Sequence, residues 1–167
     1  EKADDLEMAD IIRLMVGREL TNQFPPKTNV PGDVYLEVQH LTGMYNQLRD
    51  VSFTARRGEI LGLAGLDSSG RTETLESIFG IRTRKEGIIS LDDQPCFNRN
   101  AGESIKNGFA LLTEERRATG IFGCLNIREN TVISSLKRHK RFGLYLSEKT
   151  QREDTQHYID AMRTKTP

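Results

Sequence analysis

The stretch of residues 58–73, GEILGLAGLDSSGRTE, constrains the fold of this chain more than any other part of it. The apolar run that begins at Ile60 predicts a strand that is buried on both faces. Gly65 and Gly70 then enclose four residues, which is the spacing of the phosphate-binding pattern GxxxxGK[ST]. In a strand, turn and helix of this kind, main-chain N–H groups and the positive end of the helix face one point, so the stretch predicts a phosphate site.

The segment after the turn predicts a helix over Thr72–Phe79. Leu75, Ile78 and Phe79 fall on one face of that helix, and Gly80 is a typical helix stop. The alternative to a phosphate site is a plain structural corner, because many turns between a strand and a helix contain glycine. A strand before the turn and a helix after it favour the phosphate site.

Arg71 stands where the pattern has lysine. Arginine keeps the positive charge, but its planar fork is broader than the compact ammonium of lysine, so we expect phosphate binding to survive better than catalysis. The next residue, Thr72, keeps the hydroxyl that would face a magnesium ion.

Composition and charge exclude several classes of protein. The 167 residues carry 24 basic and 24 acidic side chains, so no net charge attracts nucleic acid or an anionic membrane. No apolar run reaches about 18 residues and no secretion leader is visible, which predicts a soluble, cytoplasmic chain. Cys96 and Cys124 lack the spacing of a zinc cluster or a disulfide framework. Because the chain begins at Glu1 and ends at Pro167, soon after a helical pattern, we expect it to be a piece of a longer protein.

Three parts are predicted along the chain: an interdomain helix and linker over residues 1–30, an α/β core with an antiparallel β subdomain over 31–125, and part of a helical subdomain over 126–167. A proline-rich stretch at 22–32 marks the first boundary. Periodicity predicts helices over 4–16, 102–107, 126–139 and 147–162, and strands over 34–42, 48–59, 87–91 and 109–117, with Asp92 and Asp93 in a turn.

Tyr45 and Glu114 are candidate ligand-binding residues. Tyr45 follows the first predicted strand and could stack on a purine; the alternative is a tyrosine on the surface of a turn. Glu114 and Glu115 end a predicted strand, where open α/β sheets bind ligands, and could order a metal-bound water or sense a phosphate. The alternative is a solvated cluster in which EERR pairs with itself. The residue pattern alone favours the plainer alternative for both.

The run from Lys137 to Arg141 resembles a nucleic-acid or anionic-lipid patch. It lacks the interleaved aromatic residues of a stacking platform, so a solvated helix end is the favoured interpretation. The three histidines, His40, His139 and His157, show no metal-ligand spacing, and we assign them no role.

Motifs from most of the chain form one set: LEVQHLT, Tyr45, LRDVSFTARRGEILGLAGL, GRTE, FGIR and FALLTEERRATGI, with MVGREL near the start. Together they resemble the ATP-binding subunits of bacterial sugar-importing ABC transporters, and among these the N-terminal part of the second nucleotide-binding half of galactoside importers. The combination of GRTE with TEERR is much more specific than the phosphate loop by itself. The resemblance implies an α/β P-loop NTPase fold of the ABC nucleotide-binding type.

The resemblance also implies a role for each candidate residue. Tyr45 would stack on the adenine of ATP, and Thr72 would face Mg²⁺. Glu114 would occupy the position of a glutamine that contacts Mg²⁺ and the attacking water. The Walker A loop would contact the nucleotide through Gly65, Leu66, Asp67, Ser68, Ser69, Gly70, Arg71, Thr72 and Glu73.

Partners and a location follow from the same resemblance. The helices after Asn126 would dock on transmembrane permease subunits, and through them the protein would serve a periplasmic or lipid-anchored sugar-binding protein. A second nucleotide-binding half would help to clamp ATP. The protein would lie in the cytoplasm, peripheral on the inner face of the plasma membrane, and would bind no nucleic acid.

Departures from the family pattern predict weak catalysis. Ser68 replaces a glycine that is common in such loops, and Arg71 with Glu114 indicates a site weakened for hydrolysis. No LSGGQ-like signature, no Walker B strand ending in Asp-Glu and no switch histidine occurs before Pro167. We therefore expect the chain alone to hydrolyse little or no ATP. Two further hypotheses remain: a degenerate module that binds ATP without hydrolysing it, and a nucleic-acid binder acting through residues 137–141.

Overall fold

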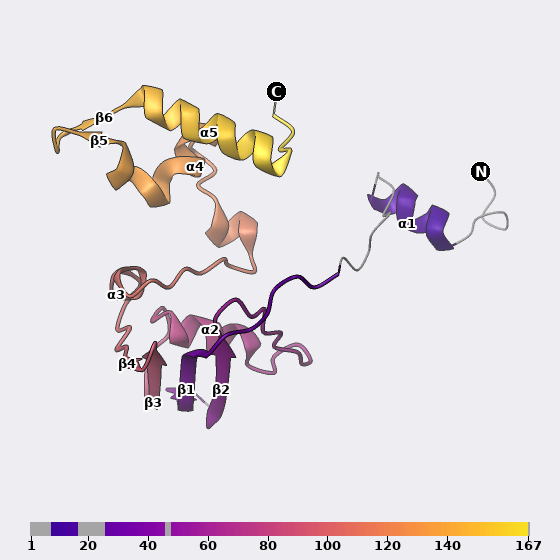
Figure 1. The fold of residues 1–167 in the computed structure, drawn as a ribbon, viewed down its shortest axis with the longest axis vertical. Coiled ribbons are helices and arrows are strands. Elements are labelled where there is room, and N and C mark those ends of the chain that lie inside the picture. The colour runs from indigo at the N-terminus through magenta and orange to yellow at the C-terminus, as the bar shows by residue number, and fades with distance from the viewer. Residues whose placement is uncertain (1–7, 17–25, 46–47, 167) are drawn as a thin grey trace. The chain divides into compact units, whose positions relative to one another are not determined.

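The computed structural model describes residues 8–16, 26–45 and 48–166. The chain forms two compact units. The first comprises the residues up to Ser69 together with Arg84–Phe97, and the second comprises Gly70–Thr83 and the residues from Asn98 onward. Figure 1 labels the elements of both, and each unit is described by itself.

An antiparallel sheet forms the first unit. Its four strands lie in the order β2-β1-β3-β4, and Figure 1 shows the three longer ones side by side. The first predicted strand is confirmed, the second is shorter at both ends than the predicted 48–59, and the third begins earlier than expected. The bounds are β1 Val34–Gly43, β2 Val51–Arg56, β3 Arg84–Leu91 and β4 Gln94–Pro95.

An extra residue in β1 changes its register. Val38 pairs with Phe53 and Leu41 pairs with Val51, so β1 has one more residue than β2 over this stretch. His40, within the bulge, takes a left-handed conformation with φ 52°. In a regular strand an odd spacing would place Val38 and Leu41 on opposite faces, and the bulge lets both be buried in the core of the unit.

The turn between β3 and β4 is the predicted one. Asp92 and Asp93 have φ values of 53° and 60°, which are the left-handed values of a two-residue hairpin turn. The Asp92 carboxylate forms an ion pair of 2.9 Å with Arg57, and the Arg57 guanidinium lies 4.1 Å from the centre of the Tyr35 ring. The hydrogen bond to Asp92 raises the pKa of Arg57 above its ordinary value. These contacts join the turn to the end of β2.

Helix α1, Met8–Val16, carries an ion pair of 3.1 Å between Arg13 and Asp10. The predicted helix began four residues earlier, and residues 4–7 lie outside the described part of the chain. The same holds for residues 22–25 of the predicted linker, whereas residues 26–32 have no regular secondary structure.

In the second unit, α2 (Arg71–Ile78) and α3 (Ala101–Lys106) confirm the two helices predicted there. Ile78 and Phe79 are buried as expected, but Leu75 is 46% exposed, so its predicted place on the buried face is wrong. The buried face instead includes Thr74, because its hydroxyl donates to the Gly70 carbonyl at 2.6 Å and enters the interior with its hydrogen bond satisfied.

The C-terminal part of the second unit, after Asn126, is mainly helical, as predicted. Asn126 and Glu129 form a reciprocal capping box at the start of α4, and the Ser147 side chain caps α5. Val132 is the buried apolar residue at the end of α4. The bounds are α4 Ile127–Val132, the 3₁₀ helix η3 Ile133–His139, β5 Lys140–Arg141, β6 Tyr145–Leu146 and α5 Glu148–Met162.

Two predicted strands are wrong. Residues 60–66 form no strand, and Ile60 is 92% exposed. Residues 109–113 also lack strand structure, Leu112 is 93% exposed, and a π-helical turn, η2 (Arg116–Gly120), follows. A buried parallel strand depends on ladder hydrogen bonds and side-chain cover from its neighbours. Among the described residues no strand pairs with either segment, so their apolar composition alone does not make them strands.

Candidate functional site

The predicted phosphate loop is an exposed turn that leads into α2. Ser69 N–H donates to the Leu66 carbonyl at 3.1 Å. Ser68 has φ 64° and Gly70 has φ 91°. Both values lie in the left-handed region that glycine occupies without strain. The serine at position 68 therefore stands at a backbone position where a glycine fits better, whereas Gly70 suits its own.

Helix α2 begins without an N-cap side chain, because Gly70 is its N-cap. Helix starts expose N–H groups that no intrahelical carbonyl accepts, and they carry the positive end of the helix dipole. Arg71, Thr72 and Glu73 occupy this first turn and are half-buried. The arrangement favours an anion at the start of the helix.

Thr72 and Glu114 meet in the second unit. The Thr72 hydroxyl donates to Glu114 Oε2 at 2.8 Å, although the two residues are 42 positions apart. Both were predicted to lie near Mg²⁺, and the fold of this unit brings them together. The donated proton leaves lone pairs on the Thr72 oxygen, while the Glu114 carboxylate supplies negative charge beside it.

Two neighbours of this pair had no signal in the sequence. The Thr113 hydroxyl, next to Glu114, is buried and has no hydrogen-bond partner among the described residues. Arg82 approaches Glu73 at 3.9 Å and forms an ion pair with Glu76. The hydrogen bond to Glu76 raises the pKa of Arg82. Glu73, predicted to contact the nucleotide, thus faces a guanidinium.

The donor atoms near Thr72 suit a hard cation. Thr72 and Glu114 offer oxygen only, which Mg²⁺ prefers, and Mg²⁺ usually keeps water and phosphate oxygens as its other ligands. Within the described ranges, no group of three or more His, Cys, Asp or Glu side chains is placed to hold a metal ion. A magnesium ion at this point would therefore depend on a phosphate for most of its ligands.

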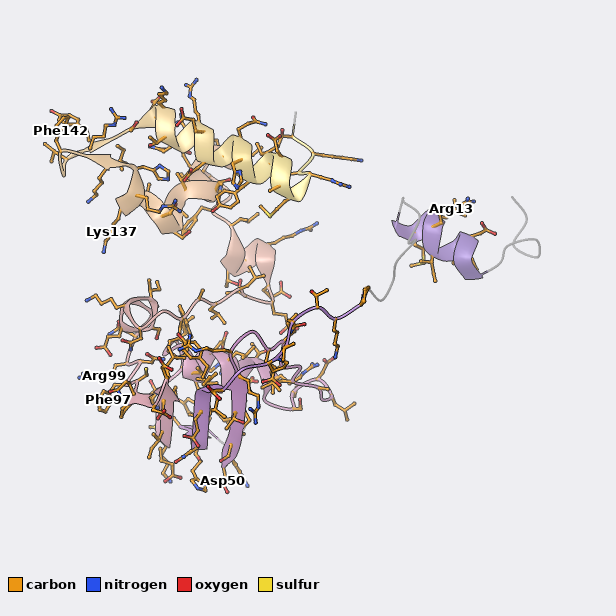
Figure 2. The ribbon with its side chains drawn as sticks, in the orientation of Figure 1. Arg13, Asp50, Phe97, Arg99, Lys137 and Phe142 are labelled. Atoms are coloured by element: carbon orange, nitrogen blue, oxygen red, sulfur yellow. The ribbon has the colours of Figure 1, made fainter. Side chains whose placement is uncertain are left out.

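Tyr45 belongs to the first unit, just past the end of β1, and is 81% exposed. An exposed ring is available for stacking, and its role at adenine stays a prediction. Residues 46–47 of the same loop lie outside the described residues. Oδ1 of Asp50, which Figure 2 labels, lies 2.6 Å from Nδ1 of His40.

The side chains of the basic run, residues 137–141, differ in burial. Lys137, Arg138, Lys140 and Arg141 are exposed, but His139 is only 2% exposed. His139 Nδ1 lies 3.1 Å from the Thr150 hydroxyl, and its Nε2 lies 3.5 Å from Asp154 Oδ2. No signal in the sequence separates the histidine from its basic neighbours, because the packing of η3 against α5 is what buries it.

Comparison with known proteins decides the family. The family model described as ABC transporter matches residues 48–166, which is more than half of the chain. The chain belongs to the ABC transporter family of ATP-binding domains. Its fold class is therefore the P-loop NTPase class, and the described antiparallel sheet and helices are parts of such a domain.

Curated relatives of this ABC transporter chain carry one shared name. The galactose/methyl galactoside import ATP-binding protein MglA of Vibrio vulnificus is 53% identical over 97% of this chain and 32% of its own length. The proteins of that name from Pasteurella multocida and Salmonella typhimurium are 52% and 48% identical over 96% and 98% of this chain. This ABC transporter chain spans about a third of the length of these relatives.

A solved structure, "Structure of ATP binding subunit of ABC transporter", is 26% identical, with a TM-score of 0.39 over 72% of this chain and 59% of that chain. Within residues 8–16, 26–45 and 48–166 of this ABC transporter chain, no helix has the length and apolar character that a bilayer crossing requires.

Proposed function

We propose that this chain is part of the ATP-binding, energy-coupling component of an ABC-type carbohydrate importer of the galactose/methyl galactoside kind. The observation that carries the proposal is the Thr72–Glu114 hydrogen bond at the start of α2. It joins the hydroxyl at the Ser/Thr position of the GxxxxGK[ST] pattern to a carboxylate from a distant segment. Relatives about 50% identical over nearly the whole chain bear the name of a galactose/methyl galactoside import ATP-binding protein, which supports the choice of substrate.

Each part of the site has a proposed task. The main-chain N–H groups of Gly65–Glu73 hold the phosphates, and the Arg71 guanidinium adds a positive charge near them. The exposed Tyr45 ring stacks on the adenine. The Thr72 hydroxyl keeps its proton toward Glu114 and turns its oxygen to the cation. When bound, Mg²⁺ would neutralise the phosphate charge.

Glu114 is the residue that limits this chemistry. A carboxylate attracts the cation but repels the triphosphate, whereas the neutral amide of a glutamine could offer an oxygen to the cation without adding negative charge beside the phosphates. We propose that the site therefore binds nucleotide better than it hydrolyses it. The chain alone, without signature and Walker B motifs between Glu1 and Pro167, should show little or no ATP turnover.

The partners proposed for the whole protein are transmembrane permease subunits, reached through the helices after Asn126, and a second nucleotide-binding half that completes the ATP site. Through the permease it would serve a sugar-binding protein. This places it in the cytoplasm, on the inner face of the plasma membrane. The names of the relatives, which are import ATP-binding proteins, support this assignment.

A second candidate function is a module that binds ATP but does not hydrolyse it in the full transporter, and acts as a regulatory half. The specific observation that favours it is the left-handed φ of 64° at Ser68, where a serine occupies a position suited to glycine. Arg71 and Glu114 point the same way. In the full-length transporter, Arg71→Lys together with Glu114→Gln should then raise turnover at this site; no change would contradict this candidate.

The test of ATP binding is a calorimetric titration of Mg-ATP into the chain. We expect saturable binding, and Arg71→Ala should weaken it about tenfold, because one charge-assisted contact to phosphate is lost. Lys85→Ala removes an exposed cation from β3 and serves as the control. The absence of saturable binding, or equal losses in both variants, would contradict the proposal. Steady ATP turnover by the chain that Thr72→Ala abolishes would contradict the expected inactivity.

A further inference from the structure

One hairpin of the second unit combines exposed cations with exposed apolar side chains. We name it the basic hairpin, residues 137–146, with the sequence KRHKRFGLYL. Its cations are all exposed: Lys137, Arg138, Lys140 and Arg141. Its apolar side chains are exposed as well: Phe142, Leu144, Tyr145 and Leu146.

The tip of the basic hairpin presents an aromatic ring to solvent. Lys140 pairs with Leu146 and Arg141 with Tyr145, and the Leu144 N–H donates back to the Arg141 carbonyl at 3.3 Å. Phe142, at the tip, is 98% exposed and has φ 52°. A left-handed conformation is unusual for a bulky residue, so local backbone preference does not account for a phenylalanine here. Figure 2 shows Phe142 at the outer end of the hairpin, beyond α4 and α5.

His139 fixes the basic hairpin to the helices of the same unit. The buried ring contacts Thr150 and Asp154 of α5, and the His139 carbonyl accepts from the Ser147 N–H at 2.9 Å. The inward histidine divides the run, so that two cations precede it and two follow it. The hairpin is therefore anchored at its base, while its cations and apolar tip remain exposed.

The charge of the basic hairpin is local. Residues 137–146 contain no acidic residue, although the whole chain has no net charge. None of the four cations forms an ion pair with a side chain in the described part of the chain. Glu148, the next acidic residue along the chain, is already paired with Arg128 at 3.6 Å and Arg152 at 3.4 Å.

We propose that the basic hairpin is a docking site for an anionic phospholipid surface. Its cations would contact the lipid phosphates, and the Phe142, Leu144 and Tyr145 side chains would enter the interface below the headgroups. This division of charge and apolar surface over a few residues is the complement of an anionic membrane face. The proposal does not rest on nucleotide binding, since no residue of the ATP site takes part.

A single-stranded nucleic acid is the other polyanion to consider. Binding sites for such strands combine a positive groove with aromatic platforms, one for each successive base. The basic hairpin is a protruding turn, and two of its four apolar side chains, Leu144 and Leu146, are aliphatic and offer no ring for stacking. These features favour the lipid surface, and RNA becomes one arm of the test.

The experiment measures co-sedimentation of the chain with vesicles at low salt and without nucleotide. Vesicles of phosphatidylcholine with about one-third phosphatidylglycerol should bind the chain, and pure phosphatidylcholine vesicles should bind it at least about tenfold more weakly. Binding should fall as salt rises, because salt screens the attraction. A polyuridine RNA is titrated under the same conditions.

Two variants separate the charged part of the basic hairpin from its apolar tip. Lys140→Gln with Arg141→Gln should weaken vesicle binding about 25-fold, or about fivefold for each charge lost. Phe142→Asn should weaken it about tenfold, since it removes the ring, and asparagine tolerates the left-handed conformation that the hairpin needs. Lys85→Gln with Lys106→Gln removes the same charge from β3 and α3 and should change binding less than about twofold. Circular dichroism checks that every variant is folded.

Three results would overturn the proposal. The first is equal binding to anionic and neutral vesicles, or none to either. The second is an equal loss in the Lys85/Lys106 control and in the Lys140/Arg141 variant, which would mean that net charge alone acts. The third is tighter binding to polyuridine than to anionic vesicles, with the same variants weakening it, which would assign the basic hairpin to RNA.

Discussion

The hydroxyl of Thr72 donates a 2.8 Å hydrogen bond to the carboxylate of Glu114. Glutamine in place of Glu114 can still accept this bond but carries no charge. Because the carboxylate repels a triphosphate, Glu114→Gln should tighten the binding of ATP measured by calorimetry without Mg²⁺ by about threefold at low salt. The gain should shrink as salt rises.

Glu115→Gln is the matched control for that variant, since it removes the same charge from the neighbouring, exposed position. Its effect on ATP affinity should be smaller. If both variants change the affinity equally, Glu114 has no special place at the phosphates.

Gly80 is a glycine of the second unit that no larger residue can replace without a clash. It follows Phe79, the C-cap of α2, with φ 76°, and a Cβ there would collide with the Asn98 carbonyl oxygen. Backbone atoms cannot give way as a flexible side chain does. Gly80→Ala should therefore lower the free energy of unfolding, measured by urea denaturation, by about 3 kcal/mol or more.

Gly108→Ala is the control that measures the cost of a left-handed alanine without the clash that occurs at position 80. Gly108 has φ 91°, but a Cβ there would meet no atom within 4 Å. The cost should be only that of a left-handed alanine, about 1–2 kcal/mol. Equal losses at the two positions would show that the close approach of Asn98 costs nothing.

Ser104 ties α3 to the end of α2. Its side chain is fully buried, and its hydroxyl donates to the Phe79 carbonyl at 2.7 Å. Ser104→Ala leaves that carbonyl without its partner in the interior and should cost about 1–2 kcal/mol of unfolding free energy. Ser134→Ala, at an exposed position on η3, should stay within about 0.5 kcal/mol. If Ser104→Ala leaves the free energy of unfolding unchanged, a water molecule replaces the hydroxyl at the Phe79 carbonyl.

The turn between β3 and β4 can be improved by one substitution. Asp93 has φ 60°, which glycine adopts without penalty, so Asp93→Gly should raise the free energy of unfolding by about 0.5 kcal/mol. Asp92→Gly relieves the strain of a similar φ of 53° but removes the ion pair with Arg57. Its gain in unfolding free energy should therefore be smaller. Thermal melting of the two variants ranks them, and the reverse order would contradict this account.

Local signals carried most of the fold prediction. Strand alternation located β1 and β2, and turn chemistry located Asp92 and Asp93. Side-chain caps marked the start of α5 at Ser147. The segments at 60–66 and 109–113 were misjudged because an apolar run specifies a buried strand only if neighbouring strands complete its ladder. Leu75 was misjudged because Thr74 can be buried once its hydroxyl bonds to Gly70.

The candidate site was only partly readable from the sequence. Pattern and resemblance selected Thr72 and Glu114, and their contact could be known only from the fold of the second unit. The orphaned hydroxyl of Thr113 and the approach of Arg82 to Glu73 depend on side-chain packing, for which spacing gives no signal. The roles of Tyr45 and of the phosphate loop stay predictions.

The bulge at His40 makes the length of β1 matter more than its composition. Removing one residue between Val38 and Leu41 would leave them two positions apart, and at this spacing a regular strand keeps both side chains on one face. Chains related to this one should therefore tolerate a single-codon deletion at the bulge better than one elsewhere in β1, which would turn the residues beyond it to the opposite face.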